Sequence, residues 1–391
     1  MHQGRYVFSQ IMDVVVRYQF NECVARYKGE YRVKNFSCWE QFLALSFGQL
    51  SFRESVRDII VCLTAHHDKL YHFGFRFRPV RTTLLLANER RDWRIYHDYA
   101  LVLIREAVAL YQNDPPGDLN LDAAVYAIDS TTIELCLNLF PWAKIASEES
   151  AIKLHLAMNL RGNIPSFFDF SRGREHDVKF LDRLVFELSA YYVMDRGYID
   201  FGRLYAIHHA GAFFVTRAKK NLVYHRLYSR PVDLATPCVR SDQIITLDGV
   251  KTKEEYPEKL RRISYVDEET GQRYIFLTND FELPAQTIAN LYKHRWQVEL
   301  FFKWIKGHLS IKVFWGRSAN AVKTQICIAL CAYLLVAIMK KKFGIRRNSY
   351  EILQILSVSL FDKTLLTTLI SEYRLPKVQE HCQKQLSLWG Y

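Results

Sequence analysis

The stretch LYKHRWQVELFFKWIKGHL, residues 291–309, restricts the fold more than any other part of this chain. Drawn as an α-helix with 3.6 residues per turn, it places Tyr292, Arg295, Glu299 and Lys306 within about 60° of arc. The opposite side carries an apolar stripe suited to docking on a hydrophobic core. That stripe consists of Val298, Phe301, Ile305 and Leu309. One face therefore packs, and the other presents an acid surrounded by cations.

A carboxylate among cations suits a site that holds a divalent metal beside a phosphodiester, because the metal ligand and the anionic backbone share one small space. The alternative is an amphipathic surface helix whose charges pair four residues apart. For an isolated helix the surface interpretation is favoured, so the choice depends on the rest of the chain.

The charge of the chain indicates a polyanionic partner. It has 391 residues, a formal net charge of +12 and a pI of about 9.2. Between residues 300 and 350 there are ten Lys or Arg and no Asp or Glu. A solvated basic face explains a modest excess, but an acid-free run that starts on the proposed metal-binding helix favours nucleic acid.

Composition is typical of a folded cytoplasmic protein. Hydrophobic residues make up 49% of the chain, enough apolar material for two or three domains. The eight cysteines contain no CxxC pair and resemble small core residues of a reduced compartment. The opening MHQGRYVFSQ lacks the pattern of a signal peptide. The longest apolar run, 326–339, is too short to span a bilayer, so we expect a buried helix and no membrane contact.

The chain changes character near residue 113. Up to that point, mixed apolar and polar spacing predicts helices, with Ser51 and Asn88 as candidate amino-terminal caps. The segment 113–118 is dense in turn formers and indicates a domain boundary. The predicted helices cover 7–27, 38–47, 52–63 and 88–110.

Short apolar strands follow the boundary. Together with one helix predicted at 178–189, they imply a mixed α/β sheet. The predicted strands are 124–128, 152–158, 166–170, 190–194, 212–216, 243–247, 262–266 and 274–278.

Two aspartates stand at the ends of predicted strands. Asp129 follows the first strand in YAIDST, and Asp195 follows the fourth in YVMDRGY. Open α/β sheets place reactive groups at the carboxyl ends of strands, so these acids converge if their strands are neighbours. Either acid alone is more often a turn or cap residue. With Glu299 they suit a two-metal site, and three carboxylates without His or Cys favour Mg²⁺ over zinc, with Mn²⁺ as an alternative.

The spacing Tyr-x2-Arg-x3-Glu-x6-Lys, filled by Tyr292, Arg295, Glu299 and Lys306, resembles the YREK signature of DDE transposases of the insertion-sequence-four type. The resemblance extends to DST after the first acid, DRGY around the second, and VTRAKKN at 215–221. The acids are separated by 65 and 103 residues. The resemblance covers about 120–340, and LLLANERRDWRIY at 84–96 is similar to the helical region that precedes the core in some members.

The resemblance implies an α/β fold whose RNase H-like mixed-sheet core is interrupted by a β-rich insertion and preceded by an all-α DNA-binding domain. The implied boundaries are 1–112 for the helical domain, 120–196 and 285–343 for the two parts of the core, 197–284 for the insertion, and 344–391 for carboxyl-terminal helices.

The resemblance also implies a chemistry. Asp129, Asp195 and Glu299 would hold two Mg²⁺ ions for cutting transposon ends, forming a hairpin end and transferring strands into target DNA. Tyr292, Arg295 and Lys306 would bind phosphates beside the scissile bond: Arg295 as a bidentate clamp, Lys306 as a point charge and Tyr292 as a neutral donor. We expect a homodimer acting on paired terminal inverted repeats, located in the cytoplasm with the nucleoid.

Five further residues are weaker DNA-binding candidates. Lys303 lies near the same helical face, and Arg217, Lys219 and Lys220 could line a channel, although such basic residues are solvated as often. Trp296 could stack on an end base, although an aromatic beside an apolar face is more often part of the core.

Lys153, His155 and His176 have no clear metal partner in the sequence, and we expect structural roles for them. In the amino-terminal region, the glycine turn HFGFRFR at 72–78 and a cluster of Arg90, Arg91 and Arg94 fit a helix-turn-helix reader of inverted repeats. A plain helical bundle explains that region equally well.

Two other functions remain open from the sequence. A structure-selective nuclease on the same core would hydrolyse DNA without joining a 3′ end to a target. A DNA-binding repressor would occupy DNA without metal-dependent chemistry, and the intact acids argue against it.

Overall fold

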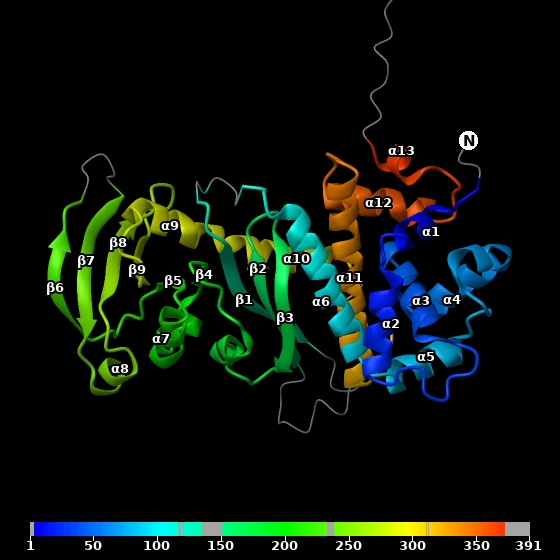
Figure 1. Ribbon diagram of the computed structural model, residues 1–391, viewed down its shortest axis with the longest axis horizontal. Helices are drawn as coiled ribbons and strands as arrows, with labels where there is room; N and C mark the ends of the chain where they lie inside the picture. Colours follow the sequence, from blue (N-terminus) through cyan, green and yellow to red (C-terminus); the bar gives the residue numbers. More distant parts are fainter. Residues whose placement is uncertain are drawn as a thin grey trace, which may run out of the picture.

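The computed structural model describes residues 4–115, 119, 121–134, 151–232, 238–309, 311 and 313–371. These residues form an elongated molecule with a mixed sheet at one end and the amino-terminal helices at the other (Figure 1). The nine strands described run in the order β3-β2-β1-β4-β5-β9-β8-β7-β6. Their bounds are β1 Val125–Glu134, β2 Ala151–Asn159, β3 Ile164–Arg172, β4 Tyr191–Met194, β5 Phe213–Arg217, β6 Tyr224–Arg230, β7 Val239–Leu247, β8 Leu260–Val266 and β9 Arg273–Thr278. The mixed α/β architecture expected from the sequence is confirmed.

The sheet has a parallel centre and an antiparallel extension. Strands β1, β4 and β5 are parallel, and β2 and β3 continue antiparallel on the outer side of β1. Strand β5 also pairs antiparallel with β9, which leads on to β8, β7 and β6. The sheet thus passes without interruption from the expected core into the expected insertion at 197–284. That division into domains stays a prediction.

Each strand predicted from the sequence is present, but some elements of this region were missed and some local predictions were wrong. The region 197–284 also contains strand β6 and the helices α7 Phe201–His209 and α8 Val250–Glu255, none of which was predicted. Strand β1 does not end before Asp129 but continues to Glu134.

The helix predicted at 178–189 is a short 3-10 helix, η4 Asp177–Arg183, followed by irregular backbone. The backbone N–H of Glu187 donates to the hydroxyl of Tyr192, and that of Ser189 donates to the carbonyl of Gly211. These N–H groups therefore have partners outside a helix.

The amino-terminal region is helical, as predicted. Its α-helices are α1 Val7–Met12, α2 Arg17–Arg26, α3 Cys38–Leu50, α4 Val56–Ala65, α5 Arg81–Arg90 and α6 Arg94–Tyr111, with 3-10 helices η1 His67–Lys69 and η2 Tyr71–Phe73. A capping box begins α3, in which Ser37 and Glu40 each accept from the other's backbone N–H.

Two stretches predicted as single helices are each broken in two. The break after α1 falls at three consecutive valines, whose β-branched side chains disfavour a helix. The break before α6 occurs where Asp92 accepts the backbone N–H of Arg94. The predicted caps were also wrong: Ser51 ends α3 and Asn88 lies inside α5, whereas Ser55 caps α4.

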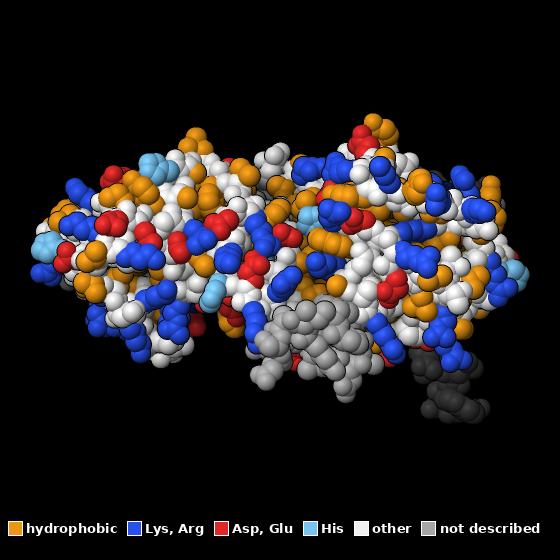
Figure 2. All heavy atoms as spheres, turned by 90° about the horizontal axis from the view of Figure 1, so that it is seen from below, with side chains coloured by type: hydrophobic (Ala, Val, Ile, Leu, Met, Phe, Trp, Pro, Cys, Tyr) orange, Lys and Arg blue, Asp and Glu red, His pale blue; other side chains and the backbone are white. Residues whose placement is uncertain are grey.

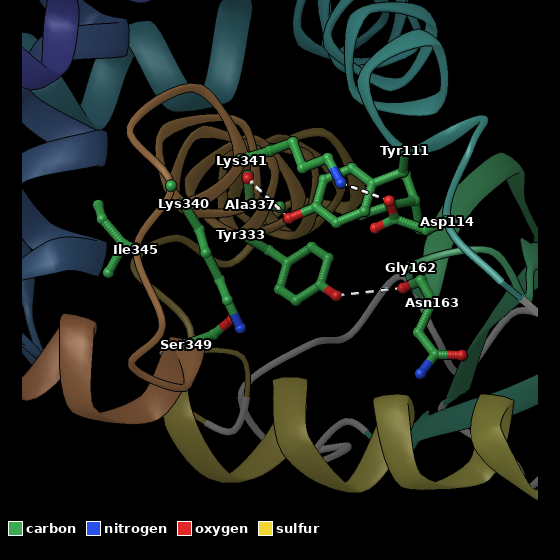
Figure 3. Close-up of a pocket in the computed structure, with 12 residues that line it drawn as sticks. Tyr111, Asp114, Gly162, Asn163, Tyr333, Ala337, Lys340, Lys341, Ile345 and Ser349 are labelled. Carbon is green, nitrogen blue, oxygen red and sulfur yellow. Dashed lines mark hydrogen bonds and ion pairs between the residues drawn. The ribbon is translucent and has the colours of Figure 1, made fainter. Parts of the chain in front are cut away.

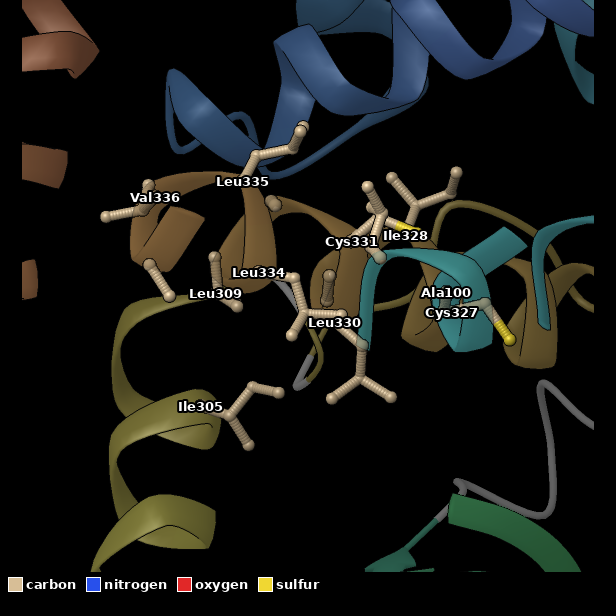
Figure 4. Close-up of a cluster of buried hydrophobic side chains, with 14 of the residues drawn as sticks. Ala100, Ile305, Leu309, Cys327, Ile328, Leu330, Cys331, Leu334, Leu335 and Val336 are labelled. Carbon is tan, nitrogen blue, oxygen red and sulfur yellow. The ribbon is translucent and has the colours of Figure 1, made fainter. Parts of the chain in front are cut away.

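Helix α11, Ala319–Lys342, is the central element of the molecule. It stands between the sheet and the amino-terminal helices and packs against α3, α5, α6 and α12 Ser349–Ser359 (Figure 1). Figure 4 shows its apolar side chains facing α10 Trp296–His308 on one side and α6 on another. The buried helix expected at 326–339 is confirmed. Among the described residues, α11 is the one helix long and apolar enough to cross a membrane, but 89% of its apolar window is buried inside the protein.

The two faces of the sheet are covered by different elements. One face joins a large core with α6, α9 Ala285–His294, α10 and α11, and includes Ala127 of β1. The other joins a smaller core with η4, η5 Arg196–Tyr198, α7 and Tyr256 after α8, and includes Ile128. Successive residues of a strand face opposite sides, so Asp129 shares the side of α10 and Ser130 the side of η4 and η5. A last short helix, α13 Leu366–Ile370, packs on α1.

Candidate active site

Asp129 and Asp195 are brought together by the parallel pairing of β1 and β4. The last paired residues are Ile128 and Met194, so each aspartate is the next residue along its own strand. Asp195 follows the end of β4, as predicted, and its Oδ1 accepts the backbone N–H of Gly197 at 2.6 Å to begin η5. Asp129 was predicted at a strand end, but β1 continues past it because its pairing with β2 extends to Glu134.

The helical stretch with the YREK spacing is divided at Arg295. Tyr292 belongs to α9, Glu299 and Lys306 belong to α10, and Arg295 joins the two helices with a helical backbone conformation. The predicted two-sided character is confirmed for the apolar side. All four stripe residues are buried: Val298, Phe301, Ile305 and Leu309.

Arg295 is the residue that connects the helix to the sheet. One guanidinium nitrogen donates to Oδ2 of Asp129 at 3.2 Å, and another donates to Oε1 of Glu299 at 2.5 Å. Its side chain is 13% exposed, and its Nε is buried without a hydrogen-bond partner in the described structure. Further along α10, Lys306 Nζ donates to the carbonyl of Thr132 at 3.0 Å. The helix therefore lies across β1 with its cations over the strand.

The electrostatics of the site are set mainly by the burial of Asp129, with two other carboxylates nearby. Burial raises the pKa of Asp129 to about 6, and Glu299 and Asp195 add to the rise. The backbone N–H of Ser130 and the guanidinium of Arg295 act in the opposite direction but do not cancel it. A nearby cation would stabilise the ionised form of a carboxyl in this environment.

The present conformation does not gather the carboxylates around a common point. Among the residues described, no group of three or more His, Cys, Asp or Glu is arranged to hold a metal ion. Arg295 lies between Asp129 and Glu299 instead. Glu299 and Asp195 are close enough to raise the pKa of Asp129, but a shared metal would require the arginine to turn aside.

Tyr292 and Arg217 border this group on the side of β9. The Tyr292 ring lies 5.0 Å from that of Phe276 and 5.6 Å from the Arg295 guanidinium, and burial raises its pKa. Arg217 sits over the ring of Tyr274 at 4.8 Å, and its charge lowers the pKa of Tyr292 in opposition to burial. Tyr292 therefore lies close to Arg295, Arg217 and Asp195, and both Tyr292 and Arg217 are half-buried.

The remaining candidates lie on the surface. Lys303, Lys219 and Lys220 are exposed, and Lys219 Nζ donates to the carbonyl of Ile199 at 3.2 Å. Trp296 is 55% exposed at the start of α10, so its interpretation as a core residue was wrong. The exposed indole ring is accessible for stacking on a base.

Comparison with known proteins bears on the same residues. The sequence matches the profile of the transposase DDE domain over residues 120–335, a range that includes Asp129, Asp195 and Glu299. The chain belongs to the DDE transposase family. A second profile, a domain of unknown function, matches residues 3–76.

Several curated members of the transposase family are similar in sequence. A putative transposase, y4zB, of Sinorhizobium fredii is 36% identical over 219 residues, 55% of this chain and 61% of that protein. A probable transposase for insertion sequence element IS5377 of Geobacillus stearothermophilus is 31% identical over 54% of this chain and 55% of its own length. A putative transposase for element IS4SA of Synechocystis is 24% identical over 66% and 71%. The matched part thus spans about three fifths of the first two relatives.

Among solved structures, a piggyBac transposase synaptic complex with hairpin DNA aligns with 96% of this chain and 86% of that chain, at 13% identity and a TM-score of 0.43. A likeness of this degree is too weak to support an inference.

The amino-terminal arginines divide into two kinds. Arg91 is held by the side chain of Gln41 and by the carbonyls of Phe36 and Ser37, and Arg94 pairs with Asp92. These two therefore have structural partners. Near the predicted turn and cluster, Arg76, Arg78, Arg81 and Arg90 are exposed, and Arg94 is exposed although it is paired. On the face in Figure 2, Lys and Arg side chains are spread along the whole length of the molecule. The helix-turn-helix assignment stays a prediction.

A cavity of about 500 Å³ lies outside this group of residues, between the ends of α6, α11 and α12 and the turn joining β2 to β3 (Figure 3). Its polar groups are largely engaged: Lys341 pairs with Asp114, and the hydroxyls of Tyr111 and Tyr333 donate to backbone carbonyls. It therefore does not compete with the acids as a reactive site.

Proposed function

We propose that this chain is an insertion-sequence transposase whose Asp129, Asp195 and Glu299 cut DNA ends and join them to a target. The observation that carries the proposal is the placement of two aspartates next to each other on parallel strands, with Glu299 held to the first of them through Arg295. The strand order β3-β2-β1-β4-β5, with β2 antiparallel, supports an RNase H-like core as the scaffold.

The carboxylate oxygens of these three acids are suitable ligands for divalent metal ions. Members of the family generally use divalent metal ions. Three carboxylates offer hard oxygen ligands. Burial, with a smaller contribution from Glu299 and Asp195, raises the pKa of Asp129, and Arg295 does not offset that rise. Two Mg²⁺ ions, or Mn²⁺ in their place, would activate the attacking oxygen and stabilise the leaving oxygen.

The protein's own residues would bind and orient the DNA. A phosphodiester can replace the carboxylates as the bidentate partner of Arg295, which frees Asp129 and Glu299 for the metal. Lys306 and Arg217 would hold neighbouring phosphates, and Tyr292 would donate a neutral hydrogen bond. The exposed Trp296 would stack on an unpaired base at a hairpin end.

We further infer the assembly and location that the reaction requires. Cut-and-paste transposition needs both terminal inverted repeats in one complex with the target DNA. A homodimer would hold the two repeats together. Such a complex would work on the nucleoid in the cytoplasm.

Cleavage assays on DNA that flanks the chain's own gene test the proposal. Asp129→Ala, Asp195→Ala and Glu299→Ala should each bind the ends normally and lose Mg²⁺-dependent cutting. Asp182→Ala is a matched control, because that acid is about half exposed and pairs with Arg203. Cutting by all three variants at the wild-type rate would show that the acids are not catalytic.

The products of the same assay separate the other functions. Strand transfer of the cut 3′ end into a plasmid distinguishes a transposase from a structure-selective nuclease, which would release ends without joining them. Stable binding with no metal-dependent product would indicate a repressor.

A further inference from the structure

A partly buried polar cluster lies directly behind Asp129, on the opposite face of the sheet. Ser130, the next residue of β1, donates its hydroxyl to Oδ1 of Asp177 at 2.8 Å. The ammonium of Lys153 on β2 donates to the same oxygen at 3.0 Å and to the carbonyl of Glu175 at 2.9 Å. Asp177 therefore joins β1, β2 and the start of η4 at the point where β1 leaves β4.

His155 continues the cluster across β2. It is the registered neighbour of Ser130, is 1% exposed, and its Nε2 makes a 2.7 Å hydrogen bond with the hydroxyl of Ser171. Its Nδ1 lies 4.0 Å from Oδ1 of Asp177 and has no hydrogen-bond partner in the described structure. The imidazole stacks on Phe180 and so packs η4 against the sheet.

Tyr198 closes the cluster from the side of the second acid. It lies three residues after Asp195, is 2% exposed, and its buried hydroxyl lies close to the side chain of Ser130. Burial raises its pKa, and the charges of Asp129, Asp177 and Asp195 raise it further, as expected for a hydroxyl close to all three. The cluster thus adjoins both aspartates of the candidate site without including either.

We infer that Asp177, acting through Ser130, is a positioning residue that fixes the orientation of Asp129 for metal binding. The connection is short: the backbone N–H of Ser130 donates to Oδ1 of Asp129 at 2.8 Å, and the hydroxyl of the same serine is held by Asp177. Residues that hold a metal ligand in place contribute about 10–100-fold to metal affinity or activity. This inference rests on the proposed metal-dependent function.

The competing explanation is that the cluster only fastens η4 to the sheet. Both explanations predict some loss of stability on mutation, but only the positioning role predicts weaker metal binding. Equilibrium binding of Mn²⁺ to the full chain without DNA, followed by electron paramagnetic resonance, distinguishes them. Ser130→Ala and Asp177→Asn should bind Mn²⁺ roughly 10-fold more weakly, and Ser130→Thr, which keeps the hydroxyl, should bind as the wild type does.

Two further variants make the result decisive. Ser166→Ala removes a hydroxyl that donates to the carbonyl of Ala157 in the same sheet, and it should leave Mn²⁺ binding unchanged. Asp129→Ala should abolish binding at the site. If Ser130→Ala and Asp177→Asn bind Mn²⁺ as tightly as the wild type, the positioning role is overturned. If the wild type binds no more Mn²⁺ than Asp129→Ala does, the proposed metal-dependent function fails instead.

Discussion

At the scale of single residues, Asp129 has the most unusual environment in the candidate site. Its side chain is mostly buried, two other carboxylates face it, and one arginine serves both it and Glu299. A carboxylate in such an environment lowers the stability of the folded state. It is typical of a site where the charge is needed for function.

Asp129→Asn should stabilise the metal-free protein at pH 7. The folded pKa is about 6 against an ordinary value of 3.8, so the folded state favours the protonated acid. Stability linked to this group is fully present below about pH 4 and is lost as the pH rises to 6. Removing the charge should recover about 1–3 kcal/mol at pH 7 and little at pH 4, measured by urea unfolding. Asp182→Asn, whose pKa Arg203 lowers, should not stabilise.

Trp296→Ala should separate DNA binding from folding. The side chain is largely exposed, so the free energy of unfolding should change by less than about 0.5 kcal/mol. Binding to hairpin-ended DNA should weaken by about 1–3 kcal/mol if the ring stacks on a base, measured by fluorescence anisotropy. Trp304→Ala is the contrasting variant, because its ring packs 5.0 Å from that of Tyr333 and its loss should destabilise the fold. Unchanged DNA affinity of Trp296→Ala would remove the stacking role.

At the scale of elements, the sequence was most informative where a pattern is local. The apolar stripe of α10 and the strand preceding Asp195 were predicted because periodicity and strand composition are properties of consecutive residues. The predicted end of strand β1 came too early. The rest of the strand pairs with β2, a partner that the sequence does not indicate. Asp177 was missed for the same reason: its partners, Ser130 and Lys153, lie 47 and 24 residues away.

The two-sided helix α10 offers a direct test of its packing. Ile305→Ala removes a fully buried side chain that faces α11 and should cost about 2–5 kcal/mol of unfolding free energy (Figure 4). Lys303→Ala, two residues earlier and exposed, should change it by less than about 0.5 kcal/mol. Guanidinium denaturation of both variants measures the difference, and equal effects would contradict the arrangement of α10.

At the scale of the whole molecule, charge governs the expected encounter with DNA. With a formal net charge of +12, affinity for duplex DNA should fall steeply as salt rises. Arg217→Ala and Lys306→Ala should each reduce the slope of log affinity against log salt by about 1. Lys251→Ala, an exposed lysine paired with Glu255 on α8, should leave the slope unchanged. Slopes are obtained from binding isotherms at several salt concentrations, and identical slopes for all variants would place the phosphate contacts elsewhere.

Helix α11 has one more consequence for such a complex. Its sides contact α3 and α6 from the amino-terminal region, and its Tyr333 ring contacts Phe301 and Trp304 of α10. The amino-terminal helices and the strand bearing Asp129 therefore lie on opposite sides of one buried helix (Figure 1). DNA bound by the amino-terminal helices would therefore reach the acids at a fixed distance. The cut would then fall a constant number of base pairs from the bound segment.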